Sequence, residues 1–281
     1  MPDHCNSCGD SPQELHTPNP MRIQEGHGMD EKVVGIIGGM GPEATVDLMA
    51  RVIKATPASD DVDHIRMIVD NNPKVPSRIK ALIEGTGESP VPCLQSMARK
   101  LADWGADFLA IPCNTAHFYH GDVQKEVTIP LLNMIDLATQ HLKESCPGLE
   151  TVGLLASTAV LNLGLYKKAF AQAGIRLLEP DADAQDRLMT AIRQVKTSTY
   201  GMEEVDNLQK AVDNLVAQGA QVLLVACTEL SIIQSQIQPQ VRLYDASQIL
   251  AEAIVSTVKG QGEHYPFVHK ESCLTDVTCR T

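Results

Sequence analysis

Two stretches of the sequence share one design, in which an apolar run ends in a cysteine and continues into polar residues and a helix. Residues 109–117 read LAIPCNTAH and contain Cys113, whereas residues 223–230 read LLVACTEL and contain Cys227, 114 positions later. A short apolar run bounded by polar residues is typical of a buried strand. The repetition of strand, cysteine, polar turn and helix indicates two related halves, each with one thiol at the same place.

Other parts of the chain repeat at nearly the same spacing. Gly35 and Gly153 lie in matching apolar runs, and Asn133 and Asp245 end another matching pair. Strands that alternate with helices predict parallel sheets flanked by helices. The sequence therefore predicts an α/β protein with two similar parallel-sheet α/β domains related by pseudo-twofold symmetry and an active site in the interdomain cleft. The matched segments are residues 33–37 with 151–156, 104–107 with 218–221, and 129–133 with 241–245.

The first half begins with a short apolar run and a glycine-rich turn. Residues 32–37 predict a strand, and the glycines of residues 38–41 permit a tight turn before a helix that runs to about residue 54. Pro42 and Glu43 suit the first turn of that helix. The spacing of the glycines is not G-x-G-x-x-G, so a small anion near the turn is favoured over a dinucleotide.

Two basic side chains occupy places where a carboxylate could bind. A strand predicted over residues 65–69 leads into a polar loop that ends at Arg78. Ligands of open α/β sheets bind beyond the carboxyl ends of the strands, so Arg78 is either a carboxylate clamp or a solvated loop arginine. Lys196 follows an amphipathic helix, where an ordinary surface lysine is the alternative to a binding residue.

Charge and hydropathy exclude several classes of partner. The formal net charge is -12, which disfavours a nucleic-acid partner because phosphate binding needs clustered Lys and Arg. No apolar run reaches the roughly 18 residues that a membrane helix needs, and the N-terminus lacks a signal-peptide pattern. We therefore expect a soluble cytoplasmic protein. Residues 1–31 and 263–281 are predicted to form a flexible N-terminal extension and a C-terminal tail.

Eight cysteines raise the question of disulfides and metals. A chain of this length builds its own hydrophobic core, so a secreted disulfide scaffold is not expected. The histidines show no metal-ligand spacing, and we predict no metal site. Four cysteines lie in the two tails, where zinc binding is the alternative to unpaired thiols: Cys5, Cys8, Cys273 and Cys279.

A pseudo-twofold axis through a cleft would turn Cys113 and Cys227 toward one ligand. Two such groups can invert a carbon centre, because one removes a proton from one face and the other returns a proton to the opposite face. A thiol with a pKa of about 8.5 can act as acid or base near neutrality. Each cysteine precedes a helix, whose N-terminal N–H groups are expected to favour the thiolate. The alternative is that both are small core residues.

Polar residues beside the cysteines are candidates for holding a substrate. The hydroxyls of Thr115 and Thr228 and the amide of Asn114, with the helix N–H groups, could bind a carboxylate and stabilise charge that develops on it. His117 either assists the thiol four positions before it or caps a helix. Glu229 either orients the thiol two positions before it or is an ordinary acid of a first helical turn.

Three motifs resemble the PLP-independent aspartate/glutamate racemase family, and most of all its aspartate racemase branch. They are GGMGPEAT at residues 38–45, PCNTAH at 112–117 and ACTEL at 226–230, and the likeness covers about residues 32–260. The resemblance implies interconversion of L- and D-aspartate, or of a close acidic amino acid. It also implies that two cysteines transfer the protons without a cofactor, usually in a homodimer.

The resemblance assigns roles to single residues. Cys113 and Cys227 match the two acid/base cysteines of the family. Met40 joins His117 and Glu229 as a candidate assisting residue. The substrate-binding positions of the family fall on Arg78, Asn114, Thr115, Thr158, Lys196 and Thr228.

In family members the last helix of the chain packs on the first domain, although it follows the second domain in the sequence. This implies a first domain of residues 32–134 plus 248–262 and a second domain of residues 135–247. Where the family often has further hydroxyl residues, this chain has Val160 and Leu163. The same fold also supports maleate isomerases, in which one cysteine attacks carbon as a nucleophile. Such an enzyme and a catalytically silent amino-acid-binding member are the alternatives to a racemase.

Overall fold

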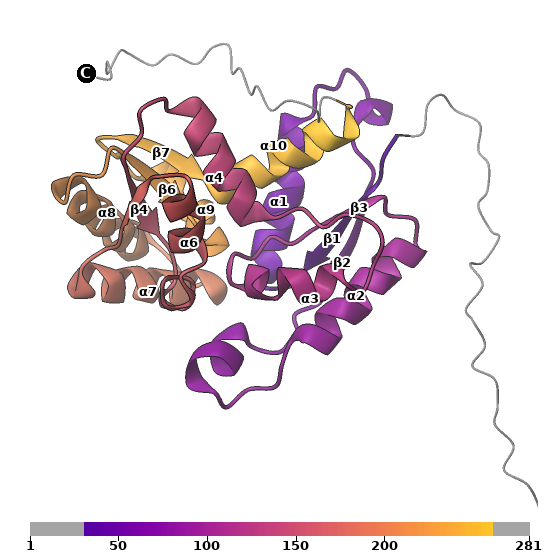
Figure 1. Cartoon of the computed structure of the whole chain (residues 1–281), viewed down its shortest axis with the longest axis horizontal. Helices are drawn as coiled ribbons and strands as arrows, with labels where there is room; N and C mark the ends of the chain where they lie inside the picture. The colour runs from indigo at the N-terminus through magenta and orange to yellow at the C-terminus, as the bar shows by residue number, and fades with distance from the viewer. Residues whose placement is uncertain (1–30, 261–281) are drawn as a thin grey trace, which may run out of the picture. The chain divides into compact units, whose positions relative to one another are not determined.

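The computed structural model describes residues 31–260, which Figure 1 draws in colour. The N-terminal extension predicted at residues 1–31 and the C-terminal tail predicted at residues 263–281, with their four cysteines, lie outside the described residues except for Glu31. No helix of the described chain is long and apolar enough to cross a membrane.

Strands and helices alternate along the described chain (Figure 1). The first part contains β1 (Val34–Gly38), α1 (Pro42–Ala55), η1 (Asp61–Asp63), β2 (Met67–Asn71), η2 (Lys80–Glu84), α2 (Val91–Asp103), β3 (Phe108–Ala110), η3 (Thr115–Tyr119) and α3 (His120–Gln124). The second part contains α4 (Met134–Ser145), β4 (Thr151–Leu155), α5 (Thr158–Leu163), α6 (Leu165–Gln172), β5 (Arg176–Leu178), α7 (Ala182–Lys196), α8 (Met202–Ala217), β6 (Val222–Val225), α9 (Thr228–Ile233), η4 (Gln234–Gln236), β7 (Arg242–Asp245) and α10 (Ala246–Val258).

The strands form two parallel sheets. The first has the order β2-β1-β3, with Val34 opposite both Met67 and Phe108. The second has the order β5-β4-β6-β7, with Val152 opposite Val222. The strands β1, β4 and β6 are buried along their whole length, as expected for strands covered on both faces. The predicted α/β fold with two parallel sheets is confirmed.

The repeat extends to a matched packing contact. A Cβ atom on Gly35 would lie 2.6 Å from Cδ2 of Leu109, and a Cβ atom on Gly153 would lie 2.6 Å from Cδ2 of Leu223. Leu109 and Leu223 have the same separation in the chain as the two motif cysteines. In each half, the absent side chain therefore lets a leucine of the neighbouring strand pack directly on the backbone.

The glycine turn after β1 makes a close contact with a distant loop. Gly39 has a φ of 91°, in the left-handed region, and a Cβ atom there would lie 2.2 Å from the carbonyl group of Asn72. Only glycine fits this position. Pro42 and Glu43 occupy the first turn of α1 as predicted. The turn therefore lies directly against the loop that leads to Arg78.

The predicted strand at residues 129–133 is wrong. Within this segment the pairing is one isolated parallel bridge between Leu131 and Leu109. Its two hydrogen bonds run from the N–H of Leu109 to the carbonyl oxygen of Pro130 at 2.8 Å and from the N–H of Leu132 to the carbonyl oxygen of Leu109 at 2.9 Å. Pro130 has no N–H group to donate to a further pair before the bridge, and the N–H of Met134, which would serve a pair after it, is taken by Nε2 of His117 at 3.0 Å. The ladder cannot extend here, which leaves the described first sheet one strand smaller than the second.

One predicted boundary differs from the structure, and two further features were not predicted. The second strand begins at Met67 and continues into Asn71. The helical segment after β4 is interrupted at Gly164, whose φ of 62° ends α5 before α6 begins. Strand β5 has only three residues, which are too few to give a periodic pattern in the sequence.

The last helix packs across the molecule. Helix α10 contacts α1 and α4. One hydrophobic cluster includes Val34 and Leu48 from the first half together with Leu154 and Leu250. The two sheet regions therefore share part of their core, and the domain boundaries given above stay a prediction.

Candidate active site

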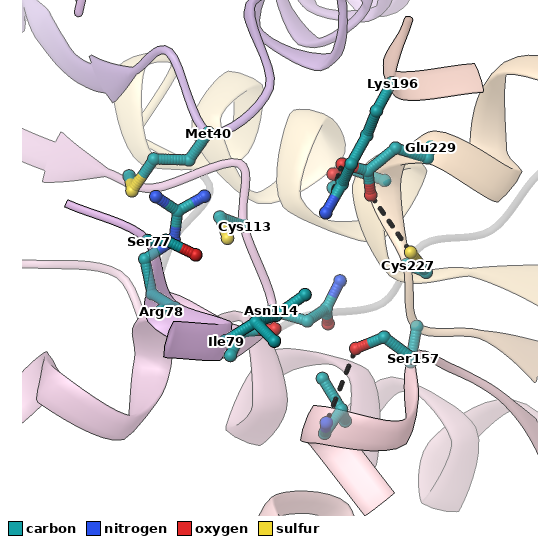
Figure 2. A pocket seen from close by; sticks show the side chains of 14 residues that line it. Met40, Ser77, Arg78, Ile79, Cys113, Asn114, Ser157, Lys196, Cys227 and Glu229 are labelled. Atoms are coloured by element: carbon teal, nitrogen blue, oxygen red, sulfur yellow. Dashed lines mark hydrogen bonds and ion pairs between the residues drawn. The ribbon is translucent and has the colours of Figure 1, made fainter. Parts of the chain in front are cut away.

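A small pocket lies between the two sheet regions and has a volume of about 50 Å³. Its lining side chains come largely from segments that follow the carboxyl ends of strands in both sheets, the edge where open α/β sheets bind ligands. Figure 2 shows the pocket from close by. The lining residues are Met40, Ser77, Arg78, Ile79, Cys113, Asn114, Thr115, Ser157, Val160, Lys196, Ala226, Cys227, Thr228 and Glu229.

The two motif cysteines lie on opposite sides of this pocket (Figure 2). Cys113 follows β3 of the first sheet, and Cys227 follows β6 of the second. Each side chain is buried, with 6% of its residue surface exposed, and both are free thiols. The pocket therefore presents one thiol from each repeated half to the same enclosed space.

The thiol of Cys227 is held by a carboxylate. Its Sγ donates a hydrogen bond to Oε2 of Glu229 at 3.0 Å. Burial and the negative charge of Glu229 raise the pKa of Cys227 well above its ordinary value, and the charge of Lys196 opposes this shift. The prediction that the helix N-terminus would favour the thiolate is therefore wrong for Cys227. Desolvation and a neighbouring carboxylate outweigh the dipole of the short helix α9.

Glu229 also pairs with a lysine at the end of α7. The Nζ atom of Lys196 lies 3.6 Å from Oε1 of Glu229, whose side chain is only 8% exposed. Burial lowers the pKa of Lys196, but the charge of Glu229, joined by each pocket cysteine when that cysteine is ionised, outweighs burial and leaves that pKa raised. A charged ammonium group therefore stands on the second-half side of the pocket.

Arg78 and Asn114, which line the pocket, each have a buried N–H group without a partner among the described residues. Nη1 of Arg78 donates to the carbonyl oxygens of Val75 and Pro76 at 3.4 and 3.1 Å. Oδ1 of Asn114 accepts from the hydroxyl of Tyr166 at 2.6 Å. Nε of Arg78 and Nδ2 of Asn114 are buried and have no hydrogen-bond partner among the described residues. Buried donors without a partner are costly, so both are suited to a ligand.

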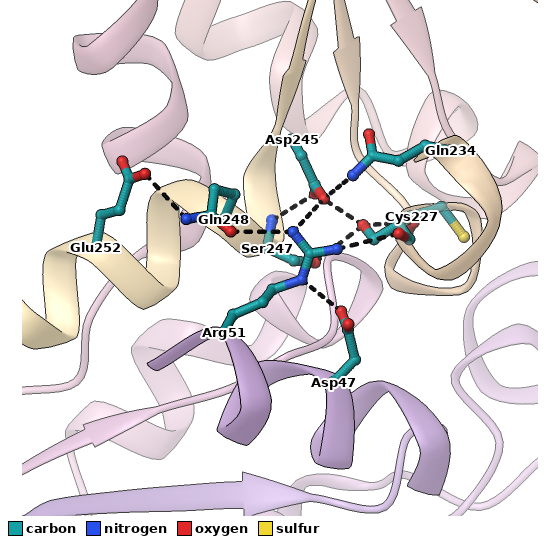
Figure 3. Close-up of polar contacts among 9 residues, drawn as sticks. Asp47, Arg51, Cys227, Gln234, Asp245, Ser247, Gln248 and Glu252 are labelled. Atoms are coloured by element: carbon teal, nitrogen blue, oxygen red, sulfur yellow. Dashed lines mark hydrogen bonds and ion pairs between the residues drawn. The ribbon is translucent and has the colours of Figure 1, made fainter. Parts of the chain in front are cut away.

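An ion-pair network behind Cys227 holds α9 against α1 (Figure 3). Nη1 of Arg51 lies 2.9 Å from Oδ2 of Asp245, and Nη2 donates to the carbonyl oxygen of Ser231 at 3.0 Å. The Ser231 hydroxyl donates to Oδ1 of Asp245 at 2.7 Å, and Asp47 binds Nε of Arg51 at 2.6 Å. The network thus fixes α9, the helix that follows Cys227, to the first half of the chain.

Two predicted site residues are not part of the pocket lining. The hydroxyl of Thr158 accepts a hydrogen bond from Nε2 of Gln185 at 3.1 Å. Nδ1 of His117 lies 2.9 Å from the carbonyl oxygen of Cys113, while Nε2 accepts from the N–H of Met134 at 3.0 Å. Burial lowers the pKa of His117 to about 4. A neutral His117 that caps the start of α4 favours the capping alternative over assistance to the thiol.

Five of the lining residues were not predicted as site residues: Ser77, Ile79, Ser157, Val160 and Ala226. Ser77 and Ile79 flank Arg78, Ala226 comes directly after β6 and Ser157 lies two positions after β4, so a search around Arg78 and at every strand end could have found these four. Val160 lies within α5 and carries no such signal. No group of His, Cys, Asp and Glu side chains within residues 31–260 is arranged to hold a metal ion.

Comparison with known families identifies the class of this fold and pocket. The model of the Asp/Glu/Hydantoin racemase family matches residues 37–254, a span that includes both cysteine motifs. The chain belongs to this family of racemases, which are isomerases.

Similar proteins include racemases with different substrate ranges. The structure of an aspartate racemase from Picrophilus torridus is 33% identical, covers 82% of this chain and 94% of its own, and superposes with a TM-score of 0.71. A broad specificity amino-acid racemase of Bacillus subtilis is 28% identical over 80% of this chain and 97% of its own length. An aspartate racemase homologue from Pyrococcus horikoshii has the same fold at 21% identity, with a TM-score of 0.64 over 82% of this chain and 100% of its own.

Proposed function

We propose that the protein interconverts L- and D-aspartate, or a close acidic amino acid, by two-base proton transfer at Cα. One observation carries the proposal: Cys113 and Cys227, from matched positions of two repeated halves, line opposite sides of one small pocket. The similarity to an aspartate racemase and to a broad specificity amino-acid racemase supports the same reaction class.

The proposed reaction balances within the pocket. A thiolate at one cysteine takes the Cα proton, and the electron pair left on carbon spreads into the adjacent carboxylate. The thiol of the other cysteine then gives its proton to the opposite face of the same carbon. The first cysteine ends as a thiol and the second as a thiolate, so the enzyme is ready for the opposite enantiomer and no other reactant is needed.

The N–H groups of the pocket would stabilise the developing charge. A substrate carboxylate would satisfy Nε of Arg78 and Nδ2 of Asn114, which lack partners among the described residues. Thr115 and Thr228 also line the pocket and add hydroxyl groups. Donors that are already in position stabilise charge in a water-poor site more strongly than water does. This support matters because the Cα proton of an amino acid is only weakly acidic.

A dicarboxylic substrate matches the charges on the two sides. Arg78 belongs to the first half and Lys196 to the second, and both line the pocket. Two cations on opposite sides of a small pocket favour a substrate with two carboxylates a short distance apart. Val160 adds an apolar wall, and the small volume disfavours a long side chain.

The proposal includes catalysis by residues of the chain without PLP and action in the cytoplasm. Two-base catalysis needs both thiols reduced, which fits a reducing compartment. The cysteines of the described residues are free thiols, as the mechanism needs.

We further propose a homodimer that forms through the exposed face of α1. This face carries Val46 and Ile53, which are 58% and 47% exposed, with Ala50 between them. A helix that is apolar on two opposite faces usually buries both. Glu43 stands at one end of the face and Lys54 at the other, so an antiparallel second copy would place opposite charges together. The face is therefore complementary to itself, as a twofold interface requires.

The experiment that tests the reaction uses the full chain without added PLP. L-Aspartate is incubated in deuterated water, and optical rotation and deuterium at Cα are followed together. We expect loss of rotation with incorporation of deuterium. Cys113→Ser and Cys227→Ser should each lower the rate by about 10²- to 10⁴-fold, the usual contribution of a general acid or base.

Cys93→Ser is the matched control, because Cys93 is a partly buried thiol that does not line the pocket. It should retain the wild-type rate. Turnover of maleate without exchange at Cα of aspartate would replace the proposal by nucleophilic cysteine chemistry. If the protein turns over neither acidic amino acids nor maleate, the result would favour a binding protein.

A further inference from the structure

Glu43, in the first turn of α1, receives two hydrogen bonds from a segment of the other half. The hydroxyl of Ser198 donates to its Oε2 at 3.1 Å, and the hydroxyl of Tyr200 donates to its Oε1 at 3.2 Å. Each carboxylate oxygen thus holds one side chain of the connection between α7 and α8. We call these two contacts the Glu43 clasp.

The clasped segment is a tight turn directly after Lys196, the last residue of α7. Ser198 has a φ of 54° and is the only non-glycine residue of the described chain with a positive φ. Such a backbone conformation persists where surrounding contacts hold it. The N–H groups of Ser198 and Thr199 donate to the carbonyl oxygens of Val195 and Gln194, both at 3.0 Å. The turn is therefore joined to the end of α7 on one side and to Glu43 on the other.

Lys196 reaches the pocket from this end of the helix. Its Nζ lies 3.6 Å from Oε1 of Glu229, and its side chain is still 37% exposed. A Cβ atom on Gly41 would lie 3.9 Å from the same Glu229 oxygen. The glycine turn that precedes α1 and the end of α7 therefore meet at one edge of the pocket, and Glu43 joins them just outside it.

We propose that Glu43 is a positioning residue that holds Lys196 in place for a substrate carboxylate. A lysine side chain has four rotatable bonds, so its ammonium group is well placed only if the backbone that carries it is fixed. The clasp fixes that backbone to the half of the chain that supplies Arg78, and so sets the separation of the two cations. This inference rests on the proposed function, in which Lys196 binds substrate.

The plainer reading is that Glu43 only stabilises the start of α1, where an acidic side chain interacts favourably with the helix dipole. The two readings differ in their consequences for Lys196. If Glu43 only interacts with the helix dipole, the Glu43→Gln variant is less stable than the wild type, but the position of Lys196 does not change. If the Glu43 clasp holds the turn after α7, the position of Lys196 depends on Glu43, Ser198 and Tyr200 together.

The first measurement does not require activity. Lys196 is acetylated with a water-soluble reagent in the absence of substrate, and the rate is read by mass spectrometry of the peptide that contains it. We expect faster acetylation in Glu43→Gln, and in the double variant Ser198→Ala with Tyr200→Phe, than in the wild type. Glu126→Gln removes a carboxylate that pairs with Arg99 on the surface and should leave the rate unchanged.

The second measurement is steady-state racemisation of aspartate and of alanine, which lacks the second carboxylate. We expect both clasp variants to raise the KM for aspartate about tenfold, the scale of one lost hydrogen bond to a charged group, with a smaller change in kcat. The KM for alanine should change little in the same variants. General damage to the fold would instead impair both substrates together.

The outcomes separate this inference from the function on which it rests. Unchanged acetylation of Lys196 in both variants overturns the clasp, whatever the activity. Faster acetylation with an unchanged KM for aspartate also overturns it, because Lys196 would then have no positioned role. Faster acetylation in a protein whose wild type racemises no amino acid supports the clasp and rejects the proposed function.

Discussion

The thiol of Cys227 donates a hydrogen bond to Oε2 of Glu229, 3.0 Å away, inside the pocket that Cys113 also lines. The other oxygen of this carboxylate lies 3.6 Å from Nζ of Lys196. Burial and the Glu229 charge raise the pKa of Cys227, so the resting protein holds Cys227 as a thiol near neutral pH. The two halves of the pocket are thus alike in backbone and different in electrostatics.

Replacing Glu229 by Gln should make Cys227 easier to ionise. The substitution removes the negative charge that raises the pKa of Cys227, so thiolate should form at lower pH. The rate of alkylation of Cys227 by iodoacetamide, followed by peptide mass spectrometry from pH 6 to 10, measures this change. We expect the midpoint to move to lower pH and racemisation to fall by about 10- to 100-fold, the scale of a lost charged hydrogen bond.

Glu203→Gln is the matched control for this change, because Glu203 is an exposed acid in the first turn of α8. Its alkylation profile should coincide with that of the wild type. A midpoint for Glu229→Gln that stays in place or moves to higher pH would contradict the role assigned to Glu229.

His117 should make the protein sensitive to acid. Burial lowers its pKa from 6.5 to about 4 in the folded protein, so the unfolded chain binds a proton more readily between these values. Stability is therefore complete above about pH 6.5 and is lost as the pH falls toward 4. The full loss is about 3 kcal/mol.

Urea unfolding at pH 7 and at pH 5 measures this effect in the wild type and in His117→Gln. The variant is expected to be less stable at pH 7, since it loses the contacts of the imidazole ring, but to lose less stability between the two pH values. An equal loss in both proteins would show that other groups cause the acid sensitivity.

The proposed dimer should depend on the exposed face of α1. Val46→Asp places a charge at the centre of an apolar contact and should convert a dimer into a monomer, as measured by sedimentation equilibrium. Trp104→Gln alters another exposed apolar side chain, 60% exposed at the end of α2, and should leave the assembly unchanged. A wild type that is monomeric at all concentrations, or a Val46→Asp variant that stays dimeric, would reject this interface.

The two matched glycines should respond alike to substitution. A Cβ atom on Gly35 or Gly153 would lie 2.6 Å from a leucine methyl group of the neighbouring strand. Gly35→Ala and Gly153→Ala should each lower the free energy of unfolding by about 1–3 kcal/mol through overpacking. Gly121→Ala is the control, because a Cβ atom on Gly121 in α3 would meet no atom within 4 Å. A large difference between the two matched variants would argue against equivalent packing.

Much of the fold could be predicted because each element has a local signature. Pro42 and Glu43 marked the start of α1, and the apolar runs marked β1, β4 and β6. The prediction failed at residues 129–133, where the apolar pattern was present but Pro130 and the contact of the Met134 N–H with His117 limited pairing to one bridge. A pattern reports which residues are buried, whereas a strand also needs free N–H and C=O groups opposite a partner.

The sequence predicted which residues line the candidate site better than it predicted their electrostatics. Cys113, Cys227, Arg78 and Lys196 all line the pocket, as do most other candidates. The expected thiolate at Cys227 was wrong, because the helix signal is local while its burial and its contact with Glu229 arise from packing.

The sequence by itself determined that the chain has two similar halves and that in each half a buried strand is followed by a cysteine. Apolar runs, glycines and polar turns reveal this because each depends on only a few neighbouring residues. Only the tertiary structure decided that the two thiols share one pocket and that His117 caps a helix. It also decided that Glu43 holds the turn after Lys196. Those relations join segments far apart in the chain, and they depend on burial and side-chain direction, which no local pattern specifies.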